Sequence, residues 1–192
     1  MRSPRLLAAG LVLCLGTLAA AAQVPAAADQ VRAAVLPLPK DLRDGATVLG
    51  YSAKGALTSL RKGTNGMTCL ASDPKSKEFH VACYHDSMEP FMVRGRELRA
   101  SGTKGPEVDS VRFREVKAGK IKMPASALLY SLSGGHFDAA TGTAADAKPL
   151  FVVYLPGATP ATTGLSPQPT AGSPWIMFPG TPKAHIMFIP VM

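Results

Sequence analysis

The segment "NGMTCLASDPKSKEFHVACYH", residues 65–85, contains two short apolar runs, each with one cysteine, on either side of a turn-forming stretch. The Asp-Pro dipeptide at 73–74 favours a turn among lysines and serines. If the two runs pair in antiparallel fashion about Ser76, Cys69 lies directly opposite Cys83, where cross-strand side chains are close enough to bridge. The segment therefore predicts a β-hairpin that is joined by a Cys69–Cys83 disulfide.

The start of the chain predicts that this disulfide forms outside the cytoplasm. Arg2 and Arg5 precede an apolar stretch that ends at Ala22, which is the organisation of a secretory signal peptide. We expect cleavage after Ala22, and a second small-residue site ends at Ala28. An uncleaved membrane anchor is the alternative, because the stretch approaches the length that spans a bilayer. After cleavage we expect no transmembrane segment and a periplasmic or secreted location.

Removal of the leader takes Cys14 away and leaves two cysteines, an even number in an oxidising compartment. Lipidation of Cys14 is not expected, because Leu13 stands where a lipoprotein signal has a small residue. On a strand, Cys83 and His85 share one face and His80 points to the other. On a helix, His80 and Cys83 would be neighbours and His85 would point away, so no regular element gathers all three side chains. A bridged cysteine is also neither a metal ligand nor a nucleophile. We therefore predict no metal at this cluster and no bound cofactor.

Three histidines in separate segments give the alternative of a metal-dependent enzyme. These are His85, His136 and His185, with Asp86 or Asp138 as an additional ligand. Sequence does not show whether they converge, and no HExxH, paired Cys-x-x-Cys or EF-hand spacing accompanies them. His185 is favoured over His80 as a site residue, because it stands beside a run of Ile, Met and Phe, where burial disfavours the charged imidazole.

Periodicity predicts an α+β fold, in which an antiparallel sheet is packed by one or two helices. Four strand candidates, read as an antiparallel meander, cover 46–51, 56–62, 67–71 and 79–84. Two later strand pairs cover 127–133 with 149–155, and 175–178 with 184–191. Helices are expected at 29–35, from Pro90 to Gly102 with Ser87 as cap, and at 106–118, although 111–114 also alternate like a strand. The helix after Pro90 has an apolar stripe at Met88, Phe91, Gly95 and Leu98, with Gly95 close to the sheet.

The same pattern predicts a simple domain organisation. A signal peptide occupies 1–22, an extended N-terminal segment 23–43 and one α+β domain 44–192. Within that domain, residues 156–174 are rich in Pro, Gly, Thr and Ser and are expected to form an exposed loop.

Positive charge is concentrated in one region of the sequence. Without Arg2 and Arg5, nineteen Lys and Arg face thirteen Asp and Glu, a net charge of about +6. The range 94–122 holds nine basic and four acidic residues, so it carries most of the excess. We take Arg94, Arg112 and Arg114 as candidate contacts for an anionic ligand or envelope component. Nucleic acid is not expected, because Phe113 is the only aromatic residue in that range.

The sequence contains no GxGxxG, no phosphate-binding Gly-Lys-Thr loop and no GxSxG motif. We therefore interpret the chain as an exported, disulfide-linked domain that binds a ligand or envelope component without evident catalysis. The metal-dependent enzyme described above is the alternative.

Three short motifs resemble a group of exported bacterial proteins. They are "GTNGMTC" at 63–69, followed by a second cysteine, then "YSLSGG" at 130–135 and "PGTPKAHIM" at 179–187. In that group an Asn-Gly-x-Thr-Cys segment precedes a terminal His-Ile-Met-like strand. The resemblance implies a secreted bacterial protein and carries over no activity, ligand or catalytic residue.

The disulfide prediction is tested by the mass of protein recovered from an oxidising compartment. We expect alkylation to leave the intact mass unchanged before reduction and to modify both Cys69 and Cys83 after it. Alkylation of both thiols without reduction would show that the bridge is absent.

Overall fold

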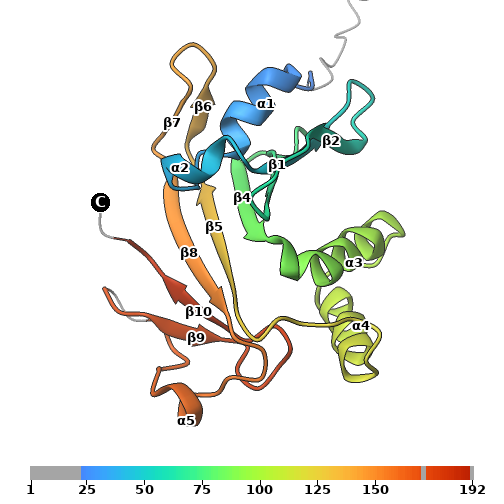
Figure 1. The fold of residues 1–192 in the computed structure, drawn as a ribbon, viewed down its shortest axis with the longest axis vertical. Helices are drawn as coiled ribbons and strands as arrows, with labels where there is room; N and C mark the ends of the chain where they lie inside the picture. Colours follow the sequence, from blue (N-terminus) through green and yellow to red (C-terminus); the bar gives the residue numbers. More distant parts are fainter. Residues whose placement is uncertain (1–22, 170–171, 191–192) are drawn as a thin grey trace, which may run out of the picture.

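The computed structural model describes residues 23–169 and 172–190, so the predicted signal peptide at 1–22 lies outside the described residues. An eight-stranded sheet forms the centre of this structure, and helices pack on both of its faces (Figure 1). The strand order is β2-β1-β3-β4-β5-β8-β10-β9, and all neighbours but one are antiparallel. The predicted α+β class with a mostly antiparallel sheet is therefore confirmed.

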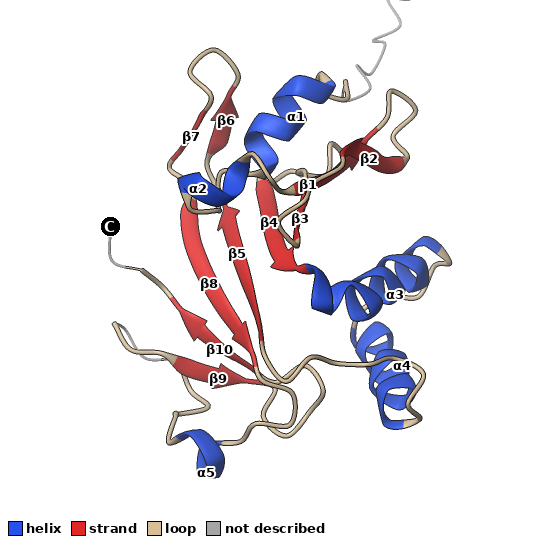
Figure 2. Ribbon diagram, viewed as in Figure 1, coloured by secondary structure: helices blue, strands red, loops and turns tan. Residues whose placement is uncertain are grey.

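The strands of the large sheet are β1 (Thr47–Tyr51), β2 (Leu57–Arg61), β3 (Met67–Leu70), β4 (His80–His85), β5 (Ala127–Ser133), β8 (Lys148–Tyr154), β9 (Trp175–Met177) and β10 (His185–Phe188). A separate hairpin consists of β6 (His136–Asp138) and β7 (Thr143–Ala145). The helices are α1 (Ala27–Ala34), α2 (Lys40–Arg43), α3 (Glu89–Ala100), α4 (Pro106–Lys117) and α5 (Pro160–Thr163). Figure 2 shows α1 and α2 near the β6–β7 hairpin, and α3 and α4 together elsewhere beside the sheet.

Strands β3 and β4 form the predicted hairpin. Cys69 pairs with Cys83 in the strand register, and the two are joined by a disulfide. Both cysteines are completely buried under α1, where Cys83 Sγ lies 3.2 Å from the carbonyl oxygen of Ala34. Because a bridged sulfur carries no hydrogen, this is a packing contact. The disulfide therefore belongs to the core and not to an exposed thiol site.

The predicted four-strand meander is wrong at one step, because β3 pairs in parallel with β1 and β2 lies at the edge of the sheet. The loop at 62–66 passes over the start of β1, where the backbone amides of Thr64 and Asn65 donate to the carbonyl of Gly45. The Asn65 side chain also donates to the carbonyl of Leu42. These bonds carry the chain across β1, so β3 starts on its far side and runs in the same direction.

The two faces of the sheet carry separate cores. On the face with the disulfide, α1, α2 and the chain between them cover the buried residues Ala34, Val35, Leu38, Ala46, Val48, Met67, Cys69, Ala71 and Cys83. On the other face, α3, α4 and the following segment cover Tyr84, Met88, Phe91, Ile121, Ala127, Val152 and Tyr154. Alternation along each strand produces this division, because successive side chains point to opposite faces.

Two helical features differ from the sequence-based expectation. Ser87 does not cap α3; instead the His85 side chain accepts a hydrogen bond from the Ser87 amide, at the start of a 3₁₀ turn that leads into α3. The segment 23–43, expected to be extended apart from a helix at 29–35, forms that helix as α1, adds the short α2 and packs against the sheet. Phe91 and Leu98 are buried, as the apolar stripe predicts.

Two long connections between the later predicted strands contain structure of their own. The segment 134–148 forms the β6–β7 hairpin. The Pro-rich range 156–174 contains α5, which begins with a capping box between Thr159 and Thr162. The Gly157 amide also donates to the carbonyl of Thr181. Within 23–169 and 172–190, no helix combines the length and the apolar character that a membrane crossing requires.

The crossing over β1 predicts that Gly63→Ala destabilises the fold. A Cβ at this position would lie 2.2 Å from the backbone nitrogen of Thr47 and 2.3 Å from the carbonyl oxygen of Gly45, and backbone atoms have little freedom to move away. We expect a loss of about 3 kcal/mol in the free energy of unfolding, measured by chemical denaturation. Thr64→Ala, at an exposed neighbouring position, is the control and is expected to change stability little. Equal stability of Gly63→Ala and wild type would contradict the close crossing.

Candidate functional site

The three histidines proposed for a metal site lie apart in the structure. His85 ends β4 on the disulfide face, His136 belongs to the outer β6–β7 hairpin, and His185 lies on β10 on the opposite face. The described residues contain no group of three metal-ligating side chains. The arrangement expected for the alternative, one metal held by these three histidines, is therefore not present in the described structure.

The two aspartates considered as additional ligands have structural partners. Asp86 accepts a hydrogen bond of 2.6 Å from the Thr68 hydroxyl. Asp138 accepts from the Ala140 amide and the Thr141 hydroxyl, which closes the turn of the β6–β7 hairpin. The hydrogen bond from Thr141 and that from the Ala140 backbone lower the pKa of Asp138. Both carboxylates therefore form hydrogen bonds that stabilise local structure.

The three candidate arginines also occupy different environments. Arg94 forms ion pairs with Glu115 and Glu97 on the helix surface. Arg114 is exposed and lines a shallow hollow between α4 and the loop before β10. Arg112 alone is buried, with 4% of its surface exposed, and it points from α4 toward the sheet.

Arg112 belongs to a pocket of about 210 Å³ between the sheet and helices α3 and α4. The sheet contributes Leu70, Ala82, Tyr84, Leu129 and Tyr154; the helices contribute Phe91, Met92, Arg96, Arg99 and Arg112; and Lys183 comes from the loop before β10. Four of these lining side chains are cationic and none is acidic. Two carboxylates that do not line the pocket form ion pairs with these cations: Glu89 with Arg96, and Asp109 with both Arg112 and Lys183. With four positive and two negative charges, the pocket is basic.

Helix α3 makes room for Arg112 at Gly95. A Cβ on Gly95 would lie 2.9 Å from Arg112 Nη1, so this glycine allows close approach of a side chain from α4 and not, as predicted, of the sheet. The guanidinium lies over the Phe91 ring, 3.9 Å from its centroid, and Nη1 donates to the Phe91 carbonyl. Nη2 donates to Asp109, whereas the buried Nε has no partner in the described part of the chain.

Asp109 joins Arg112 to the loop before β10, because Lys183 Nζ donates to its second oxygen at 2.8 Å. Burial acts to raise the pKa of Asp109, but the hydrogen bonds from Lys183 and Arg112 outweigh it and hold the pKa below its ordinary value. Asp109 is therefore ionised and shared between two cations. One carboxylate does not neutralise both.

A second network fixes Tyr84 and Arg96. The Tyr84 hydroxyl donates to Glu89 and accepts from Arg96 Nη1 at 2.9 Å, and Arg96 also pairs with Glu89. Burial, and then the hydrogen bond to Glu89, raise the pKa of Tyr84 above its ordinary value. The phenol stays protonated, and the three groups hold one another in place.

Two donors that line the pocket have no partner of this kind. The Tyr154 hydroxyl and the Arg99 guanidinium form no hydrogen bond or ion pair with any residue that the structure describes. Tyr154 is only 7% exposed, and burial raises its pKa to about 12, so the hydroxyl keeps its proton at neutral pH. Arg99 is exposed, so water can solvate its guanidinium, whereas the buried Arg112 Nε has no acceptor among the described residues, which is costly. The pocket therefore presents uncommitted donors beside excess positive charge.

His185 lies behind this pocket and does not line it. It pairs with Tyr154 in the sheet register, and the two ring centroids are 5.2 Å apart. Its Nδ1 is 2.7 Å from the Lys183 carbonyl oxygen, which assigns the proton of the neutral ring to Nδ1. Burial lowers the pKa of His185, the hydrogen bond to Lys183 opposes this, and the charge of Lys183 lowers it further. His185 supports the wall that Tyr154 forms.

Sequence reasoning missed Tyr154, Arg96, Arg99 and Lys183. Alternation along β8 places Tyr154 on the same face as Val152, which was a usable signal. Arg96 and Arg99 are three residues apart on α3, where such residues are neighbours. Lys183 has no local signal, because it reaches the pocket only through the fold of the loop before β10.

Comparison with family models, with curated proteins and with solved structures found no match to this chain. The resemblance to exported bacterial proteins therefore stays a prediction, and the functional argument rests on the geometry of the pocket.

The position of His185 predicts that acid weakens the fold. Because its pKa is lowered in the folded protein, the unfolded chain binds the proton first as pH falls, and the free energy of unfolding decreases from about pH 7 downward. We expect His185→Gln to show a smaller decrease between neutral pH and pH 5 than wild type in urea titrations. His80→Gln, at an exposed histidine on β4, is the control and should keep the wild-type slope. Parallel pH profiles for His185→Gln and wild type would contradict the argument.

Proposed function

We propose that this protein is an exported domain that binds a small organic anion in the basic pocket between the sheet and helices α3 and α4. One observation carries the proposal: the uncommitted donors of Tyr154 and Arg99 face a space that is also lined by the buried Arg112. Binding, without covalent chemistry, is the function that this arrangement supports.

The charge of the pocket favours an anion. Arg96 shares Glu89 with Tyr84, and Arg112 shares Asp109 with Lys183, so the carboxylates near the pocket are already occupied. An incoming carboxylate or phosphate meets donors and net positive charge in a partly desolvated site, where charge-assisted hydrogen bonds are strong. The planar fork of arginine suits both anion types.

The size of the pocket favours a small ligand with a short apolar part. Its volume of about 210 Å³ lies below the range of about 300 to 1,000 Å³ that drug-sized ligands occupy. Leu70, Leu129 and Phe91 line the pocket together with the charged groups. A carboxylate or phosphate ester that carries a small hydrocarbon group matches both kinds of lining.

Export is the second part of the proposal, and the N-terminal structure supports cleavage after Ala22. Gln30 Nε2 donates to the carbonyl of Pro25, and α1 begins at Ala27. Cleavage after Ala28 would remove Pro25 and the first residues of α1, whereas cleavage after Ala22 leaves both intact. The Cys69–Cys83 disulfide agrees with an oxidising, periplasmic or secreted location.

The proposal is tested by titrating the protein with phenyl phosphate and benzoate by calorimetry, with benzyl alcohol as the uncharged probe. We expect at least one anion to bind and the alcohol not to bind. Arg99→Gln and Tyr154→Phe should each weaken anion binding by about tenfold, because each removes one donor to a charged group. Arg94→Gln is the matched control, since it removes the same charge from the same helix at a residue that does not line the pocket.

Absence of binding by both anions would refute the small-anion site. An equal loss in Arg99→Gln and Arg94→Gln would also refute it, because binding would then follow the charge of the whole helix surface, as expected for an extended envelope polyanion.

A further inference from the structure

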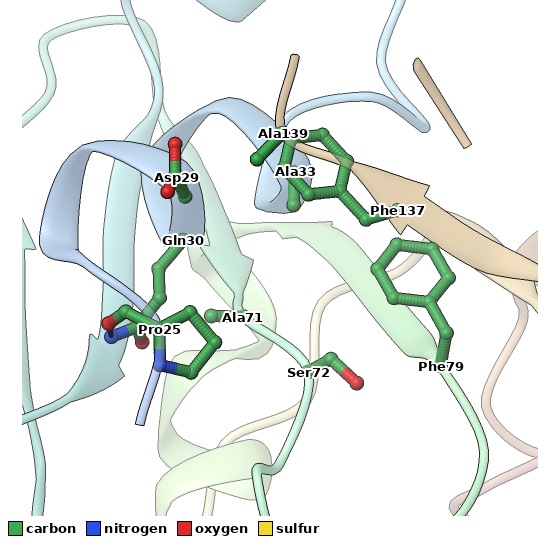
Figure 3. Close-up of a pocket in the computed structure, with 9 residues that line it drawn as sticks. All are labelled: Pro25, Asp29, Gln30, Ala33, Ala71, Ser72, Phe79, Phe137 and Ala139. Carbon is green, nitrogen blue, oxygen red and sulfur yellow. Dashed lines mark hydrogen bonds between the residues drawn. The ribbon is translucent and has the colours of Figure 1, made fainter. Parts of the chain in front are cut away.

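A second pocket, distinct in position and chemistry, lies between α1 and the β6–β7 hairpin (Figure 3). Its volume is about 300 Å³, and its lining residues are Pro25, Asp29, Gln30, Ala33, Ala71, Ser72, Phe79, Phe137 and Ala139. They come from the start of the described chain, from α1, from the two ends of the β3–β4 connection and from the hairpin. None of them lines the basic pocket.

Two nearly parallel phenylalanine rings form an apolar wall in this pocket. The rings of Phe79 and Phe137 are nearly parallel, at 16°, with centroids 6.5 Å apart, and Figure 3 shows them next to each other on one side of the pocket. Pro25 and Gln30 lie on the other side in the same view. Both rings are only partly buried, so each keeps surface that a ligand can cover.

The wall is held in place before any ligand arrives. Arg32 donates to the Ala139 carbonyl at 2.6 Å and lies over the Phe137 ring, so α1 and the hairpin are tied together. The Gly134 amide donates to the carbonyl of Phe79, which joins the hairpin to the second ring. A preformed wall lowers the ordering cost of binding.

The polar groups of this pocket carry no net charge and few free bonds. Gln30 donates both amide hydrogens, to the carbonyls of Pro25 and Tyr51, and its oxygen accepts from the Tyr51 amide. Asp29 is neutralised by Arg32 through one oxygen. The Ser72 hydroxyl accepts from the His80 amide and keeps its own proton for another acceptor. What is left is one donor, at Ser72, and one carboxylate oxygen, at Asp29.

From this geometry we propose that the pocket binds an uncharged small molecule that contains a flat ring and one hydroxyl or amide group. The ring packs against Phe79 and Phe137, and its polar group meets Ser72 or Asp29. The volume lies at the lower end of the range for small-molecule pockets, which suits one or two fused rings. An anion is disfavoured here because Asp29 lines the pocket and the cation beside it, Arg32, is already paired with it.

The test uses indole and 2-naphthol as probes, in titrations of the full protein followed by ¹H–¹⁵N NMR. We expect saturable shifts for residues around Phe79 and Phe137, and no competition from phenyl phosphate, which belongs to the basic pocket. Phe137→Leu keeps an apolar side chain but removes the ring, and should weaken binding about fivefold with an unchanged fold. Phe188→Leu, at an exposed phenylalanine on β10, is the matched control and should bind as wild type does.

Phe79→Leu provides a second test if Phe137→Leu disturbs the hairpin, since it removes the other ring from a different segment. The proposal is overturned if neither probe binds up to its solubility limit. It is also overturned if both leucine variants bind as tightly as Phe188→Leu, or if the shifts map to Tyr154 and Arg99. The anion titration uses different probes and different variants. A negative result for one pocket therefore does not affect the test of the other.

Discussion

The close crossing of Gly63 over the start of β1 determines the order of the sheet. Only a residue without a Cβ fits against the backbone of Gly45 to Thr47, and the loop that contains it is fastened by hydrogen bonds to Gly45 and Leu42. This crossing places β3 between β1 and β4 and leaves β2 at the edge. Because β3 lies inside the sheet, the cysteine pair is covered by α1, and both sulfurs are buried.

The β3–β4 hairpin then connects the two pockets. Leu70, Ala82 and Tyr84 face α3 and α4 and line the basic pocket. Ala71, Ser72 and Phe79, at the ends of the connection between these strands, line the second pocket, between α1 and the β6–β7 hairpin. The disulfide fixes the register of the two strands and with it the positions of all these residues. One hairpin of fixed register therefore contributes lining residues to both pockets.

The sequence predicts features that depend on nearby residues, and it misses features that depend on contacts between distant segments. The pairing of Cys69 with Cys83 and the apolar stripe with Phe91 and Leu98 follow from local periodicity and are confirmed. The parallel pairing of β1 with β3 depends on backbone contacts at Gly63, which no side-chain pattern encodes. The burial of Arg112 likewise depends on the space at Gly95, on another helix. The positive charge of 94–122 is divided between surface ion pairs and a pocket, and this division depends on the fold.

Burial of Arg112 costs solvation free energy, and the fold compensates for it only in part. The Phe91 ring and carbonyl and the Asp109 carboxylate contact the guanidinium, yet Asp109 also serves Lys183, and Arg112 Nε has no described partner. A purely structural arginine would gain more from a carboxylate of its own, because a buried charge is stabilised by a dedicated and fully hydrogen-bonded partner. Arg112 lines the same pocket as the unpaired donors of Tyr154 and Arg99. An anion bound there would supply the negative charge that Arg112 lacks.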